Sequence, residues 1–293
     1  NTGFLKSSAV RNIRLLAEFE EFPTRMRQEG IRGTFLFFGS ARSPTRESYA
    51  KDVASLSDKI SSSITSEKDK LAAEKRLANL KRMEWMLEWM DVTEELAKLL
   101  TEWSLTREGI ETGLAIYSHF PESATDSKQP LLVCTGGGPG FMLAGNKGAD
   151  AAGGRSMGVG VELPFETELN QYVSEGLNFQ MEYFFTRKFW EVFCAKAMIC
   201  SPGGMGTCDE MFEVMTLMQT QHCPKMPVVL LGTKFWKDII SLDKMAEYAV
   251  ISQAEVDSVC YADDAKTAFD FIRKALVNEA AELKEKGNTT PRK

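Results

Sequence analysis

Short apolar runs alternate with longer amphipathic stretches along most of this chain. Apolar runs that end at a glycine, a proline or a polar turn predict strands at 34–38, 131–134, 156–163, 178–183, 197–200 and 227–231. Helical spacing predicts helices at 9–29, 108–118, 141–152, 186–198, 235–249 and 265–286, and others beginning near residues 45 and 206. This alternation predicts an α/β fold with a doubly wound, mainly parallel, Rossmann-like sheet. We expect a single domain over residues 1–293, in which strand 178–183 is either antiparallel or parallel.

Residues 66–105 differ from this pattern and predict a helical insertion. They contain no glycine or proline and are dense in Lys, Glu, Leu, Met and Trp, so we expect one long helix or two helices in sequence. An apolar stripe follows its surface, formed by Leu80, Met83, Trp85, Met86 and Trp89. Such a stripe is more typical of a core or of a subunit contact than of a cofactor site.

Three of the predicted strands end in glycine-rich turns, FGSAR at 38–42, TGGGPG at 135–140 and SPGGMGT at 201–207. In a parallel sheet these turns share one edge, where ligands bind. The second turn is neither a P-loop nor a GxGxxG motif. Together the turns predict a site for a phosphate-bearing small molecule, with these candidate binding residues: Gly39, Ser40, Gly136, Gly137, Gly138, Gly140, Met142, Lys188, Pro202, Gly203, Gly204, Gly206 and Thr207.

Residues 197–213 predict a strand, a glycine-rich loop and a helix in direct succession. The first amides of such a helix have no intrahelical partner and suit a phosphate, to which Thr207 adds a hydroxyl donor. Glu210 falls in the first turn of this helix, where the dipole favours its ionised form. A ribose between the two would separate this carboxylate from the phosphate. The simpler alternative is a tight turn followed by a favourable helix-terminal charge.

The helix at 186–198 carries the other candidate. Phe185, Phe189, Val192 and Phe193 recur at helical spacing, which predicts that this stripe faces the sheet. Arg187 then lies off the stripe and near the helix N-terminus, where the dipole disfavours a cation. It is either a solvated surface arginine or an arginine that faces an incoming anion.

The composition argues against several classes of partner and site. The net charge of −6 offers no broad basic surface for nucleic acid, and no run approaches the 18 apolar residues of a membrane span. Six cysteines without a CxxC pair indicate reduced thiols in an intracellular, cytoplasmic protein. Two histidines make a histidine-based metal site or catalytic triad improbable, so we expect no metal and no cofactor. The chain begins at Asn1, which leaves room for an upstream targeting segment that has been removed; the sequence given has no signal-peptide hydrophobic region.

The motif PGGMGTCDE at 202–210 resembles the PGGxGTxxE signature of the cytokinin-activating phosphoribohydrolases, the Lonely Guy family, long described as lysine decarboxylase-like. Arg187-Lys188 is similar to the family's Arg-Lys pair, and FGSAR and GGGPGFM resemble its other nucleotide-binding turns. The similarity runs from about residue 33 to residue 236. The insertion at 66–105 is a departure, since it is longer than the connection in compact members, and it leaves the base pocket and the oligomeric state open.

The resemblance implies hydrolysis of a nucleoside 5′-monophosphate, AMP or a cytokinin riboside monophosphate, to free base and ribose 5-phosphate. It also implies a metal-free site, a homodimer or higher homo-oligomer, Arg187 and Glu210 as the catalytic pair, and Gly203, Gly204, Gly206 and Thr207 as the phosphate cradle. The chemistry agrees, because cleavage builds positive charge on the ribose, which the Glu210 carboxylate can stabilise.

Two other functions were weighed. A decarboxylase needs a lysine that forms a Schiff base with pyridoxal phosphate. Lys188 is the only candidate beside the motif, and the lysine of the family pair is not used that way. A nucleotide-binding sensor or carrier without turnover uses the same fold. Release of free base distinguishes that alternative from the enzyme.

Overall fold

The computed structural model describes residues 2–5, 7–64, 66–120, 127–161 and 169–285. Its centre is a seven-stranded sheet in the order β4-β3-β2-β1-β5-β6-β7, in which every neighbouring pair is parallel. The strands are β1 (Gly33–Phe38), β2 (Leu131–Thr135), β3 (Ser156–Val161), β4 (Asn178–Met181), β5 (Ala195–Cys200), β6 (Val228–Leu231) and β7 (Val259–Ala262). The predicted doubly wound α/β fold is confirmed, and the open question about β4 is decided in favour of a parallel strand.

The six predicted strands are all present, and their differences from the prediction have local causes. Strand β5 begins two residues early, because helix α8 (Phe184–Cys194) ends before the small residues Ala195 and Ala197. The sequence did not predict β7, a half-buried edge strand of four residues with a weak pattern. Residues 162 and 163, the predicted end of the third strand, lie outside the described residues.

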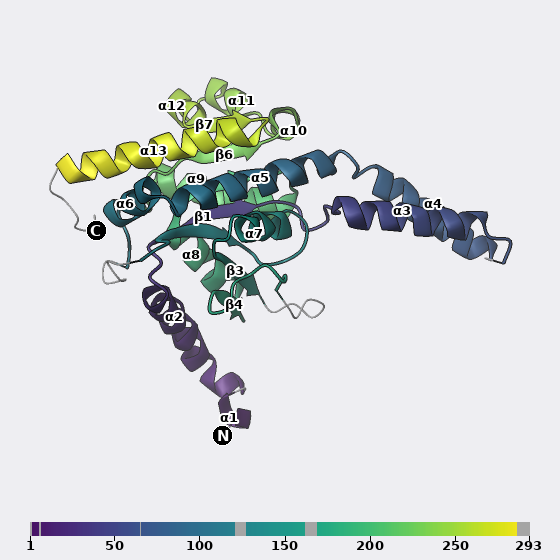
Figure 1. The fold of residues 1–293 in the computed structure, drawn as a ribbon, viewed down its shortest axis with the longest axis horizontal. Coiled ribbons are helices and arrows are strands. Elements are labelled where there is room, and N and C mark those ends of the chain that lie inside the picture. Colours follow the sequence, from purple (N-terminus) through teal and green to yellow (C-terminus); the bar gives the residue numbers. More distant parts are fainter. Residues whose placement is uncertain (1, 6, 65, 121–126, 162–168, 286–293) are drawn as a thin grey trace.

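Helices cover both faces of the sheet, as Figure 1 shows. Alternate β1 residues divide the core: Leu36 and Phe38 join one apolar cluster, and Phe35 and Phe37 join the other. The first face is covered by α2 (Arg11–Gln28), α8, α9 (Met205–Gln219), α10 (Thr233–Ile239), α11 (Leu242–Glu247) and α12 (Gln253–Asp257). The second face is covered by α5 (Met86–Ser104), α6 (Arg107–Ala115), α7 (Phe141–Ala151) and α13 (Ala265–Glu285). A short helix, α1 (Thr2–Leu5), and a 3-10 turn (Ser8–Val10) precede α2.

One predicted helix is broken in the structure. The prediction of a helix at 235–249 is wrong in the middle, where Ile240 is extended and Ser241 caps a new helix, so that α10 and α11 form in its place. The Ser241 hydroxyl accepts a hydrogen bond from the Lys244 amide at 3.2 Å. A serine that caps a helix favours a new start over continuation, because it satisfies an amide that a helix start leaves free.

Residues 66–105 form two helices, α4 (Glu67–Lys81) and α5, and only the first leaves the body of the molecule. Helix α4 pairs with α3 (Arg46–Ser61) in a projecting hairpin with its own small apolar cluster (Figure 1). Helix α5 lies on the sheet, with Leu96 and Leu100 fully buried. Trp89 packs into the core, whereas Trp85 is 40% exposed and rests one ring face on Phe235 at a centroid distance of 5.3 Å.

The six cysteines are free thiols, as the sequence indicated. Cys134, Cys194 and Cys200 are fully buried, and burial raises the pKa of each thiol. Within the described ranges, no helix combines the length and the apolar character that a membrane crossing requires.

Candidate active site at the carboxyl edge of the sheet

The three glycine-rich turns meet at the carboxyl ends of β1, β2 and β5. The Ser40 amide donates a hydrogen bond to the Pro202 carbonyl at 3.1 Å, and the Ser40 carbonyl accepts one from the Phe141 amide at 3.2 Å. The turn after β1 thus joins the other two. The chain runs from β1 toward β4 on one side of the sheet and from β5 toward β7 on the other, so β1 and β5 flank the switch point where such folds bind ligands.

Two glycines of these turns allow the contact between them. A Cβ on Gly39 would lie 2.5 Å from the Cβ of Phe141. Gly140 has a φ of +66°, and a Cβ there would lie 2.2 Å from the Ser40 carbonyl oxygen. These positions therefore require glycine for packing between the turns, and they shape the site from behind.

The glycines of the third turn have a different surrounding. A Cβ on Gly204 or on Gly206 would meet no atom within 4 Å, so both face open space. The first intrahelical hydrogen bond of α9 runs from the Cys208 amide to the Gly204 carbonyl at 3.0 Å, which places the amides of 205–207 in the unpaired first turn. Thr207 lies behind this surface, buried, with its hydroxyl where a Cβ of Gly203 would fall. Open glycines beside unpaired amides are the features that suit an anion, so the anion site that the sequence predicted stays a prediction at this position.

A buried hydrogen-bond network holds the second turn, and the sequence analysis missed it. The Asn170 side-chain amide donates to the carbonyls of Gly137 and Gly138, both at 3.1 Å, and to Asn146 Oδ1 at 2.9 Å. The Thr135 hydroxyl accepts from the Gly137 amide at 2.8 Å. Nothing in the local sequence marks Asn170, because these partners lie 24, 32 and 33 residues away.

Arg187 is largely buried in this site, which corrects part of the predicted orientation of helix α8. Val192 is buried and Phe193 packs against the core, as predicted. Phe185 and Phe189, however, are 52% and 42% exposed, whereas the Arg187 side chain is only 12% exposed. The guanidinium turns inward, where polar acceptors lie within hydrogen-bond distance of it. A single-sequence pattern of apolar residues contains no information about those acceptors.

Three acceptors from three elements surround the Arg187 guanidinium. Its Nε donates to the Val159 carbonyl at 2.8 Å, Nη1 to Glu210 Oε1 at 3.4 Å, and Nη2 to Glu191 Oε1 at 3.2 Å. Gly136 lies against it, since a Cβ there would come within 2.7 Å of Nη2. The structure thus brings the predicted pair, Arg187 and Glu210, together and adds Glu191, which the sequence analysis did not select. The sequence feature that could have identified Glu191 is its position one helical turn after Arg187.

The charges of this cluster perturb one another. Burial raises the pKa of Glu191 to about 8 and also raises that of Glu210, while the nearby Arg187 charge opposes both shifts. Burial alone lowers the pKa of Arg187, but the charges of Glu191 and Glu210 bring it above its ordinary value. Arg187 is therefore a permanent cation, and the two carboxyl groups share it.

Lys188, the next residue of α8, pairs with other carboxylates of α9. Its ammonium lies 2.9 Å from Asp209 Oδ2 and 2.6 Å from Glu213 Oε2. Despite partial burial, these two carboxylates raise its pKa above the ordinary value. Lys188 therefore ties α8 to α9 behind the loop, and both of its ion-pair partners belong to α9.

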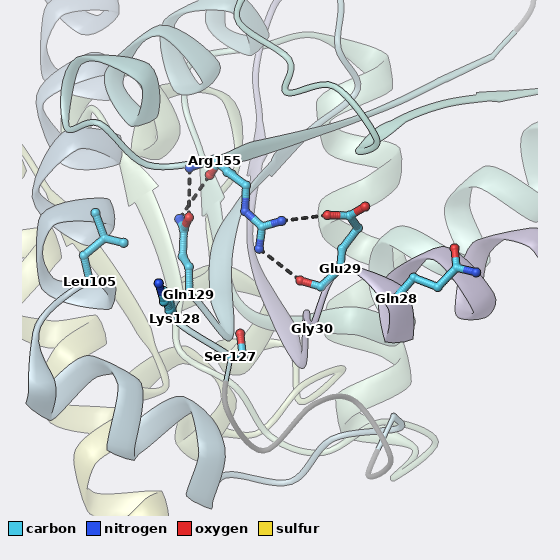
Figure 2. Close-up of a pocket in the computed structure, with 8 residues that line it drawn as sticks. All are labelled: Gln28, Glu29, Gly30, Leu105, Ser127, Lys128, Gln129 and Arg155. Carbon is cyan, nitrogen blue, oxygen red and sulfur yellow. Dashed lines mark hydrogen bonds and ion pairs between the residues drawn. The ribbon is translucent and has the colours of Figure 1, made fainter.

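A cavity of about 350 Å³ lies at the opposite, amino edge of the sheet (Figure 2). Its lining comes from residues just before β1, β2 and β3 and from the end of α5, and includes Glu29, Gln129 and Arg155. None of the predicted site residues lines it. Parallel sheets bind ligands at the carboxyl ends of their strands, so the predicted site and this cavity lie at different edges of the sheet.

Comparison with known proteins supports the resemblance of the motifs. The model of a family described as "Possible lysine decarboxylase" matches residues 142–272, a stretch that contains Arg187, Glu191 and Glu210. No curated protein matches the chain. The X-ray structure of TM1055, a structural genomics target, is 18% identical with a TM-score of 0.44 and covers 83% of this chain and 99% of its own. The molybdenum cofactor binding protein of the phototrophic bacterium Rippkaea orientalis is 17% identical with a TM-score of 0.38, over 62% of this chain and 87% of its own. Both likenesses are too distant to carry an argument about function.

Proposed function

We propose that this protein hydrolyses nucleoside 5′-monophosphates to free base and ribose 5-phosphate. The match of residues 142–272 to the family model described as "Possible lysine decarboxylase" supports this, as does the resemblance of the motifs to those of the Lonely Guy phosphoribohydrolases. One observation supports this most directly. A buried carboxylate and guanidinium, Glu210 and Arg187, lie beside the open amide surface at the start of α9. Such a site suits a ligand that joins a phosphate to a centre where positive charge develops.

The residues have separate roles in the proposed reaction. The amides of 205–207 bind the phosphate, and the ribose extends from there toward Glu210. Water attacks C1′ as the bond from C1′ to the base nitrogen breaks. The bonding electrons leave with the base, which takes up a proton. The Glu210 carboxylate stabilises the positive charge on the sugar or accepts a proton from the water, and Arg187 holds the ribose hydroxyls or the phosphate.

The family description also names lysine decarboxylation, for which this site is unsuited. That chemistry uses pyridoxal phosphate bound to a lysine as a Schiff base, which requires a neutral amine. Lys188 lies between two carboxylates that raise its pKa and hold it as an ammonium. The residues at this edge therefore do not fit the cofactor.

Base release from a panel of nucleoside 5′-monophosphates, followed by chromatography, tests the proposal. We expect turnover of AMP or a prenylated AMP and none of adenosine, because the glycine turn recognises phosphate. Efficient adenosine hydrolysis would contradict phosphate recognition. AMP binding without any base release would favour the alternative, a nucleotide-binding sensor or carrier.

A homodimer is part of this proposal. Large apolar side chains stay exposed on two neighbouring helices, Ile13 and Leu16 on α2 and Phe184, Phe185 and Phe189 on α8. Exposed apolar groups that gather on adjacent helices are typical of subunit contacts. Light scattering at micromolar concentration is expected to give at least the mass of a dimer, and a monomer mass would contradict it.

A further inference from the structure

Glu191 is a completely buried acid whose presence the two roles above do not explain. Its side chain has 0% exposure and lies one helical turn after Arg187 on α8. Oε1 accepts the hydrogen bond from Arg187 Nη2 at 3.2 Å, and Oε2 is buried with no hydrogen-bond partner among the described residues. A buried carboxylate oxygen without a partner is costly when it carries charge.

The charges around Glu191 do not balance if every group is ionised. Arg187 supplies one positive charge, and Glu191 and Glu210 would supply two negative charges. Lys188, on the same helix, is already paired with Asp209 and Glu213. Cys134, on β2, is a neutral thiol because burial raises its pKa well above the ordinary value. One proton on the carboxyl pair restores neutrality, and the more buried carboxyl is the one that retains it.

We propose that Glu191 is a positioning residue of this site, which in its protonated form fixes the Arg187 guanidinium without adding a second negative charge beside Glu210. The expected effect on KM rests on the proposed function, whereas the charge state of Glu191 does not. A neutral carboxyl still offers one oxygen to Arg187, so the contact to Nη2 survives protonation. Arg187 is then left to pair with Glu210 and with an incoming anion.

Ionisation of Glu191 is expected to weaken the binding of an anionic ligand. The raised pKa of about 8 places that ionisation just above neutral pH. A second carboxylate then competes for Arg187 and repels a phosphate. The phosphate of AMP is fully ionised above pH 7, since its second pKa is about 6, and contributes no titration in this range. The affinity for nucleoside monophosphates therefore falls at alkaline pH.

The kinetic test compares the parent protein with Glu191→Gln between pH 6 and pH 10. Glutamine keeps an acceptor oxygen for Arg187 and cannot ionise. We expect the parent KM for AMP to rise by up to about tenfold per pH unit above pH 8, and the rise to be absent in Glu191→Gln. Asp209→Asn is the matched control, because it removes a carboxylate that is 64% exposed and is paired with Lys188 instead of Arg187. It should keep the alkaline rise, and a Glu191→Gln profile that also keeps it would overturn the inference.

A second measurement needs no turnover. Carbon-13 NMR of the protein labelled at glutamate carboxyl carbons should show one carboxyl that titrates near pH 8 in the parent and is absent from Glu191→Gln. The absence distinguishes Glu191 from Glu210 and Glu279, whose pKa values burial also raises. Titration of every glutamate below pH 6 would overturn the inference. If the parent cleaves no monophosphate but one carboxyl titrates near pH 8, the proposed function fails while the charge state of Glu191 stands. If the parent cleaves a monophosphate but no carboxyl titrates near pH 8, only the proposed role of Glu191 is rejected.

Discussion

Each of the two edges of the sheet holds an arginine, in different ways. At the amino edge, Arg155 pairs with one carboxylate, Glu29, at 2.8 Å, and both side chains keep about a third of their surface exposed, 37% and 34%. At the carboxyl edge, Arg187 is 12% exposed and contacts two carboxyl groups. The first arrangement is neutral and solvated and needs no further partner. The second places two carboxyl groups around one guanidinium in a largely buried position, where the pKa values of both carboxyl groups are raised.

The comparison also separates shape from chemistry. The amino edge has the cavity, with the Arg155–Glu29 pair at its wall (Figure 2). The carboxyl edge has the unpaired helix amides, the open glycines and the perturbed carboxyl groups. Concavity alone would select a different edge from the one that we propose for anion binding, because recognition of a phosphate needs donors and not volume.

The largest expected effect at the carboxyl edge is that of Glu210→Gln. Glutamine keeps the shape and removes the charge that the reaction needs, so kcat should fall about 100-fold or more with little change in AMP affinity. Base release and AMP titration measure the two quantities. The matched control at the amino edge is Glu29→Gln, which should leave kcat unchanged. Helix α9 begins at Met205, so Glu210 is its sixth residue and lies beyond the first turn in which the sequence predicted it. Full turnover in Glu210→Gln would therefore remove Glu210 from the proposed reaction.

Arg187→Ala should lower turnover and also weaken AMP binding, because an arginine that contacts the ligand acts in the ground state and the transition state alike. Removal of the cation leaves buried carboxyl groups unpaired, and the free energy of unfolding at neutral pH should fall by about 3–5 kcal/mol. Urea denaturation and calorimetric titration measure these effects. Unchanged AMP affinity in a folded Arg187→Ala protein would remove Arg187 from the binding site.

Gly206→Ala separates folding from binding at the phosphate loop. Gly206 lies in α9 and faces open space, so alanine should raise the free energy of unfolding by about 0.5–1 kcal/mol through helix propensity. The new methyl group covers the amides, and ribose 5-phosphate binding should weaken about tenfold or more through lost charge-assisted hydrogen bonds. Weaker binding together with lower stability would instead indicate a disturbed loop.

The pH dependence of stability should also distinguish the two edges. The folded-state pKa of Glu191 is raised above its unfolded value, so the folded protein binds more protons than the unfolded chain between about pH 4.5 and pH 8. Stability from this group is complete at low pH and is lost as pH rises through this window, by at most about 1.4 kcal/mol per pH unit. Urea midpoints of Glu191→Gln should fall less steeply than those of the parent.

Arg155→Ala is expected to have the smallest effect. A single ion pair with a third of its surface in solvent contributes about 0–1 kcal/mol, so unfolding should change by no more than that, and AMP binding and turnover should not change. A loss of activity in this variant would show that the two edges are coupled and would contradict the distinction between them.

The sequence predicted much of the fold and of the candidate site because these features are local. Apolar runs that end in glycine identified β1, β2 and β5 and the turns that follow them, and the three turns do meet. The same local information was insufficient for α8. Its aromatic residues predicted which face is buried, but the structure exposes Phe185 and Phe189 and buries Arg187.

The sequence alone thus determined the order of most strands and helices along the chain, the glycine turns and the arginine and glutamate at their spacing. Only the tertiary structure decided that Arg187 turns inward, that Asn170 holds the second turn and that Glu191 becomes the second carboxyl neighbour of Arg187. The physical reason is that hydrophobic periodicity measures how much apolar surface a helix can bury, whereas the orientation of α8 follows from specific acceptors on β3 and α9. Those acceptors lie 28 and 23 residues away in sequence and come within hydrogen-bond distance only when the sheet has formed.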